Sequence, residues 1–132
     1  MSSLRIAEAA RYLGVSDDTL RRWIADGRLT GSRDSSNRVV VDGRELAAVA
    51  AANADALDDP SGVLSSARNR FTGLVTEVVI DGVMAQVSLQ CGPFRVVSLM
   101  SAEACRQLEL EPGRVATASV KATMVSIDTP TS

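Results

Sequence analysis

The sequence predicts an α+β protein made of two small domains, with helices first and strands second. Apolar residues recur at helical spacing in the first part of the chain, and from Arg70 onward they recur at every second position. Between the two patterns lies Asp58-Asp59-Pro60-Ser61-Gly62, a charged stretch with Pro and Gly that is typical of a linker. We therefore expect one domain over residues 1–57, a linker over 58–64 and a second domain over 65–132.

Composition limits what such a chain can do. Apolar residues make up 45% of the 132 residues but aromatic residues only 3%, so each domain has little bulk to bury. Domains of about 60–70 residues are marginally stable alone, which favours oligomerisation. The chain has no histidine and only two cysteines, Cys91 and Cys105, so we expect neither a metal cation site nor an enzyme. It has no apolar leader and no membrane-spanning run, so we expect a cytoplasmic protein with no membrane partner.

The first domain begins with two helices joined by a tight turn. The apolar stripe of the first helix consists of Ile6, Ala9, Ala10 and Leu13. Gly14 is suited to the left-handed residue that ends a helix. Ser16 is a strong N-cap for a second helix, which extends to about Asp26 and is ended by Gly27. Two short helices connected in this way indicate a helix-turn-helix.

A hairpin and a third helix follow. Asp34-Ser35-Ser36-Asn37 has turn chemistry and residues 38–41 favour a strand, so residues 33–41 predict the wing of a winged helix-turn-helix. Asp42 and Glu45 have the spacing of a capping box. They predict an Ala-rich helix that reaches about Leu57.

Charge and motif together indicate that the first domain binds DNA. Between Leu20 and Arg44 lie six arginines and three aspartates, a local excess of three positive charges in a chain of net charge −2. The residues that carry a family resemblance are Ala7-Glu8-Ala9-Ala10-Arg11-Tyr12-Leu13-Gly14-Val15-Ser16, Thr19-Leu20-Arg21-Arg22-Trp23 and Gly27-Arg28-Leu29. Over about residues 4–52 they resemble the MerR/excisionase-type DNA-binding domain. One departure is Ile6, where the family often has a capping Ser or Thr, so we expect a weak start to the first helix.

The resemblance implies that the second helix enters the major groove of double-stranded DNA. We expect Leu20 and Trp23 to lie in the core. The base and phosphate contacts that we expect from this helix come from Ser16, Thr19, Arg21 and Arg22. On the wing, Arg33 and Arg38 are expected to meet phosphate or the minor groove.

The second domain reads as strand, hairpin, strand, helix and strand. On its first strand Leu74, Thr76, Val78 and Ile80 alternate with Val75, Glu77 and Val79. Asp81-Gly82 is a hairpin turn, and a third strand follows at Phe94 to Met100. Ser101 caps a short helix, after which a last strand extends to Met124 with Lys121 on its polar face. This order is compatible with a small OB-like β-barrel.

Two stretches of this domain carry donors suited to a small oxyanion. Residues 65–73 provide hydroxyls, a guanidinium and backbone N–H groups, and residues 120–123 provide the only lysine of the chain. The same residues are also consistent with solvated charges at strand ends. The patterns that carry a resemblance are Ser66-Ala67-Arg68-Asn69, Phe71-x-Gly73-x-Val75 and Val120-Lys121-Ala122-Thr123. Over roughly residues 64–129 they resemble the molybdate-binding Mop domain (molbindin, TOBE superfamily).

The Mop resemblance implies a barrel that binds molybdate or tungstate as an oxyanion. The donors that it implies are the side chains of Ser66, Arg68 and Lys121 and the backbone N–H groups of Ala67 and Ala122, supported by Asn69 and Thr123. In this family the pocket lies between two Mop units. Because the chain contains one unit, we expect a homo-oligomer, a dimer or higher, formed through this domain.

Together the two domains predict a molybdate- or tungstate-responsive DNA-binding transcriptional regulator. A cytoplasmic protein that binds and stores molybdate is an alternative, and operator binding separates it from a regulator. A Mop-type sensor of another anionic ligand, such as a nucleotide or a pterin, is a second alternative. A ligand screen separates this sensor from the molybdate-responsive protein.

Overall fold

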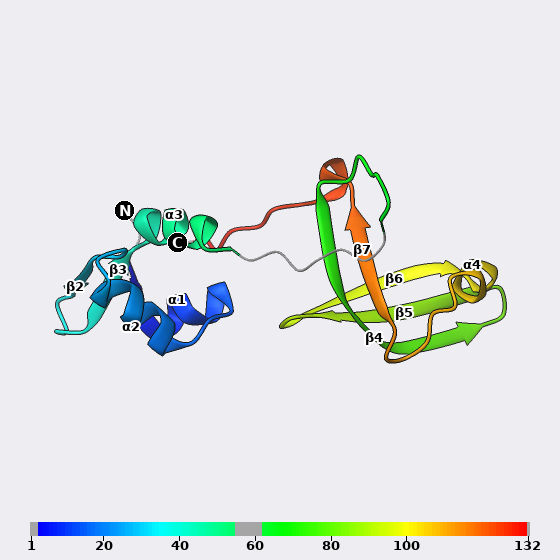
Figure 1. Ribbon diagram of the computed structural model, residues 1–132, viewed down its shortest axis with the longest axis horizontal. Helices are drawn as coiled ribbons and strands as arrows, with labels where there is room; N and C mark the ends of the chain where they lie inside the picture. The colour runs from blue at the N-terminus through cyan, green and yellow to red at the C-terminus, as the bar shows by residue number, and fades with distance from the viewer. Residues whose placement is uncertain (1–2, 55–61, 132) are drawn as a thin grey trace. The chain divides into compact units, whose positions relative to one another are not determined.

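The computed structural model describes residues 3–54 and 62–131 (Figure 1). The chain divides into two compact units, Met1–Ala56 and Leu57–Ser132. The first combines helices with a small sheet, and the second is a four-stranded antiparallel sheet that curls into a half-barrel. The α+β class predicted from the sequence is confirmed. No helix in the described parts of the chain is long and apolar enough to cross a membrane.

Two short helices form the helix-turn-helix of the first unit. α1 (Ile6–Leu13) ends at Gly14, whose φ of 68° lies in the left-handed region. α2 (Asp17–Ala25) begins after Ser16, whose hydroxyl accepts a hydrogen bond from the Thr19 N–H at 3.1 Å. The predicted stop of the first helix and the predicted cap of the second are therefore confirmed.

A three-stranded sheet accompanies these helices. Its strands are β1 (Ser3–Arg5), β2 (Gly31–Arg33) and β3 (Val39–Asp42), in the order β1-β3-β2 and antiparallel. β2 and β3 are the predicted wing hairpin. The sequence analysis did not predict β1, because three residues are too few to show a period. β1 leads directly into α1, whose N-cap residue Arg5 makes no capping hydrogen bond with its side chain, in agreement with the expected weak start.

α3 (Gly43–Ala52) begins as predicted, but only one of the two hydrogen bonds of a capping box forms. The Asp42 carboxylate accepts a hydrogen bond from the Glu45 N–H at 3.1 Å. The Glu45 carboxylate does not return to Asp42. It accepts a hydrogen bond from the Thr30 N–H instead, which connects the helix to the residue before β2.

α3 also ends earlier than predicted. Its C-cap is Asn53, whose side-chain amide donates to the Val49 carbonyl at 2.8 Å and whose side-chain oxygen accepts from Arg28 Nη1 at 3.0 Å. These two hydrogen bonds hold the Asn53 side chain at the helix end, and Asn is a residue that favours helix ends over helix interiors. The predicted continuation is therefore wrong at Asn53, and Leu57 lies outside the described residues.

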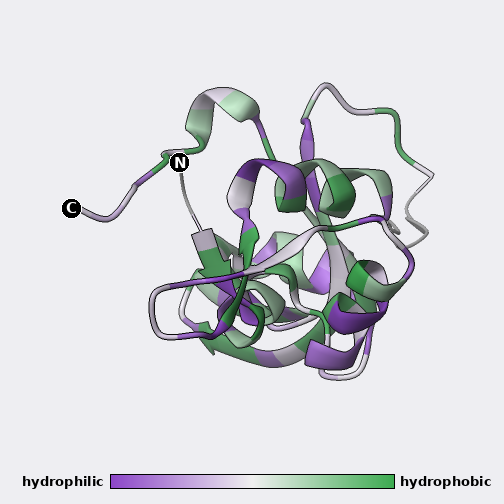
Figure 2. Ribbon diagram, turned by 90° about the vertical axis from the view of Figure 1, so that its left-hand side faces the viewer, coloured by the Kyte–Doolittle hydropathy of each residue, from purple (hydrophilic) through white to green (hydrophobic). Residues whose placement is uncertain are grey.

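The core of the first unit combines all of these elements. Its buried side chains are Ile6, Ala9, Ala10, Leu20, Trp23, Leu29, Val41 and Leu46. Leu20 is fully buried and Trp23 is 8% exposed, so both occupy the core as expected. Figure 2 shows helices and strands that mix hydrophobic and hydrophilic residues, which is typical of elements with one buried face.

The second unit is built on four strands and a short helix. These elements are β4 (Asn69–Asp81), β5 (Met84–Cys91), β6 (Phe94–Ser101), α4 (Ala102–Gln107), β7 (Val115–Val120) and the 3-10 turn η1 (Ala122–Met124). The sheet order is β6-β5-β4-β7 (Figure 1). β4 and β5 form the predicted hairpin, with Gly82 at a φ of 61° in its turn. Ser101 caps α4 by accepting from the Ala104 N–H, as predicted.

The strict alternation predicted for the first strand does not hold. The register of β4 on β5 shifts between Val75 and Glu77, so that Thr76 forms a bulge. A bulge moves one extra residue into a strand and reverses the faces that follow it. Val75 and Val78 consequently both contribute to the core, although the period of two places them on opposite faces.

β4 also passes very close to β5 at Gly73. A Cβ atom at this position would lie 2.1 Å from the carbonyl oxygen of Gln90 and 2.9 Å from the Cys91 sulfur. Only a residue without a side chain fits there. Gly73 therefore allows β4 to bend over the sheet.

The last strand ends four residues earlier than predicted. β7 stops at Val120, which pairs with Asn69, the first residue of β4. Beyond this pair β4 offers no further partner, so the chain turns into η1 instead of continuing to Met124 as a strand. Lys121 is therefore the N-cap of η1 and not a residue on the face of a strand.

Candidate functional sites

The pairing of β4 with β7 brings together the two cations predicted to bind an oxyanion. Asn69 and Val120 are the last pair of this antiparallel ladder, and Asn69 Nδ2 donates to the Val120 carbonyl at 3.1 Å. Arg68 directly precedes Asn69, and Lys121 directly follows Val120. The two cations therefore lie at the same end of the ladder, although 52 residues separate them in the sequence.

Both side chains are available at this end. Arg68 and Lys121 are exposed, and neither forms an ion pair with a carboxylate among the described residues. Ser66 is exposed in the loop that leads into β4. A guanidinium, an ammonium and a hydroxyl are thus gathered where they donate without a competing negative charge.

The two predicted backbone donors, the N–H groups of Ala67 and Ala122, differ in whether they already donate a hydrogen bond within the chain. The Ala67 N–H already donates to the Ser65 hydroxyl at 3.1 Å, and Ala67 is buried at 9% exposure. Ala122 is the first residue of η1, where N–H groups have no partner within the helix. The Ala122 N–H is therefore the more accessible donor, and the Ala67 N–H reaches a ligand only if Ser65 rotates.

Two residues near this end have roles that the sequence analysis described incompletely. Ser65 lies in the donor stretch but was not predicted to hold the Ala67 N–H. The Ser-x-Ala spacing, in which a hydroxyl bonds to the N–H two residues on, is the signal for it. Asn69 connects the ends of β4 and β7 through its bond to the Val120 carbonyl, whereas Thr123 is exposed on η1.

The N-terminal part of α2 presents the residues predicted to contact DNA. The Ser16 hydroxyl caps the helix by accepting from the Thr19 N–H, and it lies 2.9 Å from the Thr19 hydroxyl. Arg22 is exposed and follows the buried Leu20 by two residues, which places it on the other side of the helix from Leu20. Arg21 is also exposed and forms an ion pair of 3.6 Å with Asp18 on the same helix.

The wing is held by hydrogen bonds within its turn. The Asp34 carboxylate accepts from the N–H groups of Ser36 and Arg38, each at 2.9 Å, and the bond from the Arg38 N–H lowers the pKa of this carboxyl below its usual value. Arg33 Nη1 donates to the Asn37 carbonyl at 2.9 Å, so part of its guanidinium is engaged in the turn. The Arg38 side chain is exposed.

Among residues 3–54 and 62–131, no three His, Cys, Asp or Glu side chains cluster in a way that would hold a metal ion. Cys91 and Cys105 are buried free thiols, and burial raises the pKa of Cys91.

Comparison with known families defines the class of protein that this fold represents. Residues 3–54 match the family described as helix-turn-helix domain, and residues 65–127 match the TOBE domain. The chain therefore contains a helix-turn-helix domain in its first unit and a TOBE domain in its second. Helix-turn-helix and TOBE domains are typical of non-catalytic binding and regulatory proteins, and a helix-turn-helix suggests DNA binding.

Three solved structures are similar to about half of this chain. A molybdate-binding protein from Sporomusa ovata is 30% identical over 51% of this chain and all of that chain, with a TM-score of 0.49. MopII from Clostridium pasteurianum is 33% identical over 50% of this chain and all of its own, with a TM-score of 0.47. The cytoplasmic molybdate-binding protein ModG is 38% identical over 48% of this chain and 46% of its own, with a TM-score of 0.45. No curated protein sequence gives a significant match.

Proposed function

We propose that the protein is a DNA-binding transcriptional regulator that responds to molybdate or tungstate. The observation that carries the proposal is the β4–β7 register, which gathers Arg68 and Lys121 at one end of a TOBE domain in a chain that also has a helix-turn-helix. As a regulator that reads DNA, the protein would act in the cytoplasm.

The chemistry of this end suits a tetrahedral dianion. Two cations offset its charge, and Ser66 with the Ala122 N–H adds neutral donors. Dehydrating a dianion is costly, and donors that are already in place offset this cost. The similar solved proteins that are described as molybdate-binding indicate which ligand to test first.

One unit supplies only part of a closed pocket. Ser66, Arg68 and Lys121 are all exposed in the single chain, so water reaches each of them. A second copy that covers this end would exclude water and strengthen each charge-assisted hydrogen bond. We therefore propose that the functional unit is a dimer or a higher homo-oligomer formed through the TOBE domain.

The DNA-binding part of the proposal rests on α2 and the wing. Arg21 and Arg22 are exposed and Thr19 is half-buried on the helix that enters the major groove in helix-turn-helix proteins. Arg33 and Arg38 flank the wing turn. A two-fold assembly presents two copies of this helix, which favours a palindromic operator.

Titration calorimetry with molybdate, tungstate, sulfate and phosphate tests the ligand. We expect molybdate and tungstate to bind more tightly than the smaller sulfate, and equal binding of all four anions would contradict the proposal. Footprinting on the upstream region of the protein's own gene, with and without molybdate, tests the regulator. Tight molybdate binding without protection of any DNA would indicate a storage protein instead.

A further inference from the structure

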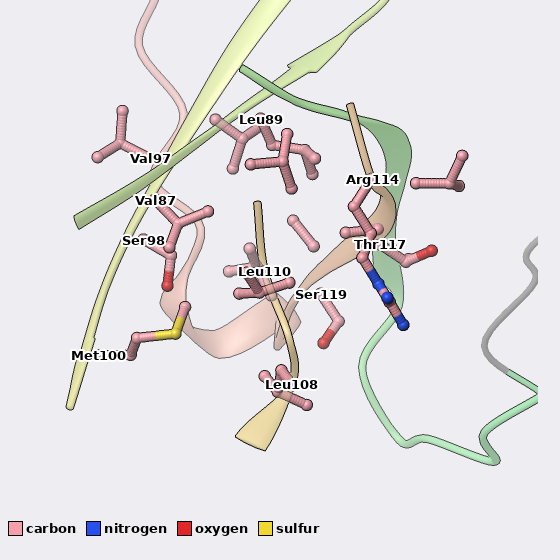
Figure 3. Close-up of a pocket in the computed structure, with 16 residues that line it drawn as sticks. Val87, Leu89, Val97, Ser98, Met100, Leu108, Leu110, Arg114, Thr117 and Ser119 are labelled. Carbon is pink, nitrogen blue, oxygen red and sulfur yellow. The ribbon is translucent and has the colours of Figure 1, made fainter. Parts of the chain in front are cut away.

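The cavity of the second unit is mostly apolar and offers no unpaired charge. It is an open space of about 670 Å³ against the core side of the half-barrel, with Leu89 and Met100 among the side chains around it (Figure 3). Arg114 is the one cation among its lining residues, and it forms an ion pair of 3.7 Å with Glu109. The first unit, by contrast, exposes arginines without a carboxylate partner on the sheet that carries the wing.

This three-stranded sheet has one face on the core and an outer face away from it. Val41 lies in the core and Val39 packs against it, so Val40 between them points to the outer face. In the pairing of β3 with β1 and with β2, Val40 lies opposite Arg5 and Ser32. Residues directly opposite each other on antiparallel strands point to the same face. Arg5, Val40 and Ser32 therefore form one row on the outer face.

The ends of β2 and β3 add charged residues to the outer face. Arg38 and Asp42 lie two residues before and after Val40, so both point the same way as Val40. The Asp34 N–H donates to the Arg38 carbonyl at 3.0 Å, which adds one more pair to the β2–β3 ladder and places Asp34 opposite Arg38. Strands about 4.8 Å apart and a rise of about 3.4 Å per residue put the Cα atoms of Arg5 and Arg38 about 8 Å apart.

The carboxylates of the outer face are engaged, whereas its arginines are not. Asp34 accepts from two backbone N–H groups of the wing turn, and Asp42 accepts from the Glu45 N–H. The hydrogen bond from the Arg38 N–H lowers the pKa of Asp34, and the charges of Arg38 and Arg5 lower it further, so both arginines lie near the wing turn. Arg5 and Arg38 are exposed, and neither side chain forms a hydrogen bond or an ion pair with another described residue.

Arg5 is also unfavourable for the helix that it precedes. It is the N-cap residue of α1, a position where Ser, Thr, Asp or Asn normally accepts a hydrogen bond from the first turn. An arginine side chain has no acceptor, and its positive charge is unfavourable at a helix N-terminus. A residue that weakens its own element without a local compensation indicates a role elsewhere.

We propose that Arg5 contacts DNA, and that Arg5 and Arg38 together bind phosphate groups of one strand of the duplex. The inference rests on the proposed DNA-binding function, and it adds a residue of β1 to the contacts expected from α2 and the wing. Guanidinium groups bind phosphate through charge-assisted hydrogen bonds, which position a protein on the duplex without reading its sequence. This role explains why an arginine occupies a position where it weakens α1.

Arg5→Thr in the full chain separates this role from a structural one, because Thr supplies the missing cap while the charge is removed. We expect the thermal unfolding midpoint of the first unit to rise, and the dissociation constant for DNA, measured by fluorescence anisotropy, to increase about fivefold or more. The increase should be equal on a duplex from the upstream region of the protein's own gene and on an unrelated duplex of the same length. The slope of log affinity against log salt concentration should become shallower by about 1.

Two further variants control for charge and for folding. Arg5→Lys keeps the charge and adds no cap, so we expect its dissociation constant to stay within about twofold of the parent value. Arg106→Thr removes one positive charge from the second unit and should leave DNA binding nearly unchanged. An Arg5→Lys variant that loses as much affinity as Arg5→Thr would refute the role of the charge.

The remaining outcomes distinguish this inference from the proposed function. If the parent chain binds DNA and Arg5→Thr binds both duplexes with unchanged affinity and salt slope, the contact by Arg5 is refuted and the DNA-binding function stands. A loss confined to the upstream duplex would assign Arg5 to a base and refute the phosphate contact. A parent chain that binds neither duplex would refute both the inference and the DNA-binding function.

Discussion

Arg68 and Lys121 are both exposed to solvent in the single chain. The affinity that they can give a ligand depends on their lying at the same end of the β4–β7 ladder. A lone exposed cation contributes little to anion binding, because water competes with the ligand for each donor. Two cations at the same end of the ladder, with a hydroxyl nearby, would offset the charge of a single dianion together. The arrangement of both cations at the end of the β4–β7 ladder is therefore a stronger reason to propose anion binding than either residue alone.

Removal of either cation should abolish measurable molybdate binding. Loss of one charged partner in a dehydrated site typically costs about 2–5 kcal/mol, or roughly thirty-fold or more in affinity. We expect this loss for Arg68→Ala and Lys121→Ala, and also for Lys121→Arg, since a planar guanidinium does not replace an ammonium in a pocket sized for it. Ser66→Ala removes one neutral donor and should cost about 1 kcal/mol.

Calorimetry on these variants measures the effect, and circular dichroism confirms that they fold. Arg106→Ala is the matched control, because Arg106 is an exposed arginine of the same unit on α4. If Lys121→Ala binds molybdate as well as the parent chain, the oxyanion site lies elsewhere.

Gly73 is a residue whose role is purely steric. A Cβ atom at Gly73 would overlap the Gln90 carbonyl, which belongs to the backbone of β5 and has little freedom to move. We expect Gly73→Ala to destabilise the second unit by about 1–3 kcal/mol or more, as overpacking does, measured by urea unfolding. Gly31→Ala is the control, because its Cβ would meet only side chains, at 3.4 Å. Similar losses of unfolding free energy in both variants would show that the close approach of β4 to β5 at Gly73 does not cause the destabilisation.

At the scale of elements, α2 carries the residues that we propose to contact DNA. Trp23 and Leu20 anchor one face of the helix in the core, so the opposite face with Arg22 is held in a defined orientation. We expect a helix that is fixed in this way to lose little conformational entropy on binding DNA.

Arg22→Ala should weaken specific DNA binding by about 1–3 kcal/mol if the side chain reaches a base edge. The Arg21/Arg22 double alanine variant should lose the footprint entirely, and binding by the parent chain should weaken steeply with salt, because phosphate contacts release counterions. Arg106→Ala, which removes one positive charge from the other unit, controls for the change in net charge of Arg22→Ala. Unchanged protection by the double variant would exclude α2 as the recognition helix.

Two predictions made from local sequence fail because contacts with neighbouring elements change the structure. Glu45 has the spacing of a capping box, yet its carboxylate bonds to Thr30 because the sheet lies within reach. β7 has strand-forming residues beyond Val120, yet it stops there because its partner β4 begins at Asn69. In both cases a contact distant in sequence decides the outcome.

At the scale of the whole molecule, the two units differ in how much apolar surface they leave open. Among residues 3–54, Tyr12 is the only large hydrophobic side chain that is clearly exposed, whereas many such side chains are exposed on β4, β5 and β6 and after β7. Exposed apolar surface of this kind marks an interface. The second unit is therefore where we expect copies of the chain to associate.

Ligand binding should stabilise the protein through this second unit. A ligand that binds only the folded state at one hundred times its dissociation constant adds about 2.7 kcal/mol. For a domain of this size that corresponds to a rise in Tm on the order of 10 °C. Thermal unfolding with molybdate should show the rise in the parent chain and not in Lys121→Ala. An equal rise in both, or with sodium chloride at matched ionic strength, would indicate a general salt effect.

The sequence by itself determined most of the helices, turns and strands, because each depends on residues within a few positions. Gly14 stops a helix, Ser16 caps the next, and Asp81-Gly82 closes a hairpin through local backbone chemistry. The motif around Arg68 and Lys121 also predicted which cations to propose for an oxyanion site.

Only the tertiary structure decided how these elements end and which residues meet. The bulge at Thr76 reverses the faces of β4, and no period in the sequence marks it, because a bulge arises from the pairing of two strands. The partner of the Ala67 N–H is likewise a matter of loop geometry. Arg68 and Lys121 become neighbours only through the Asn69–Val120 pair, since strand register depends on contacts between residues far apart in the chain.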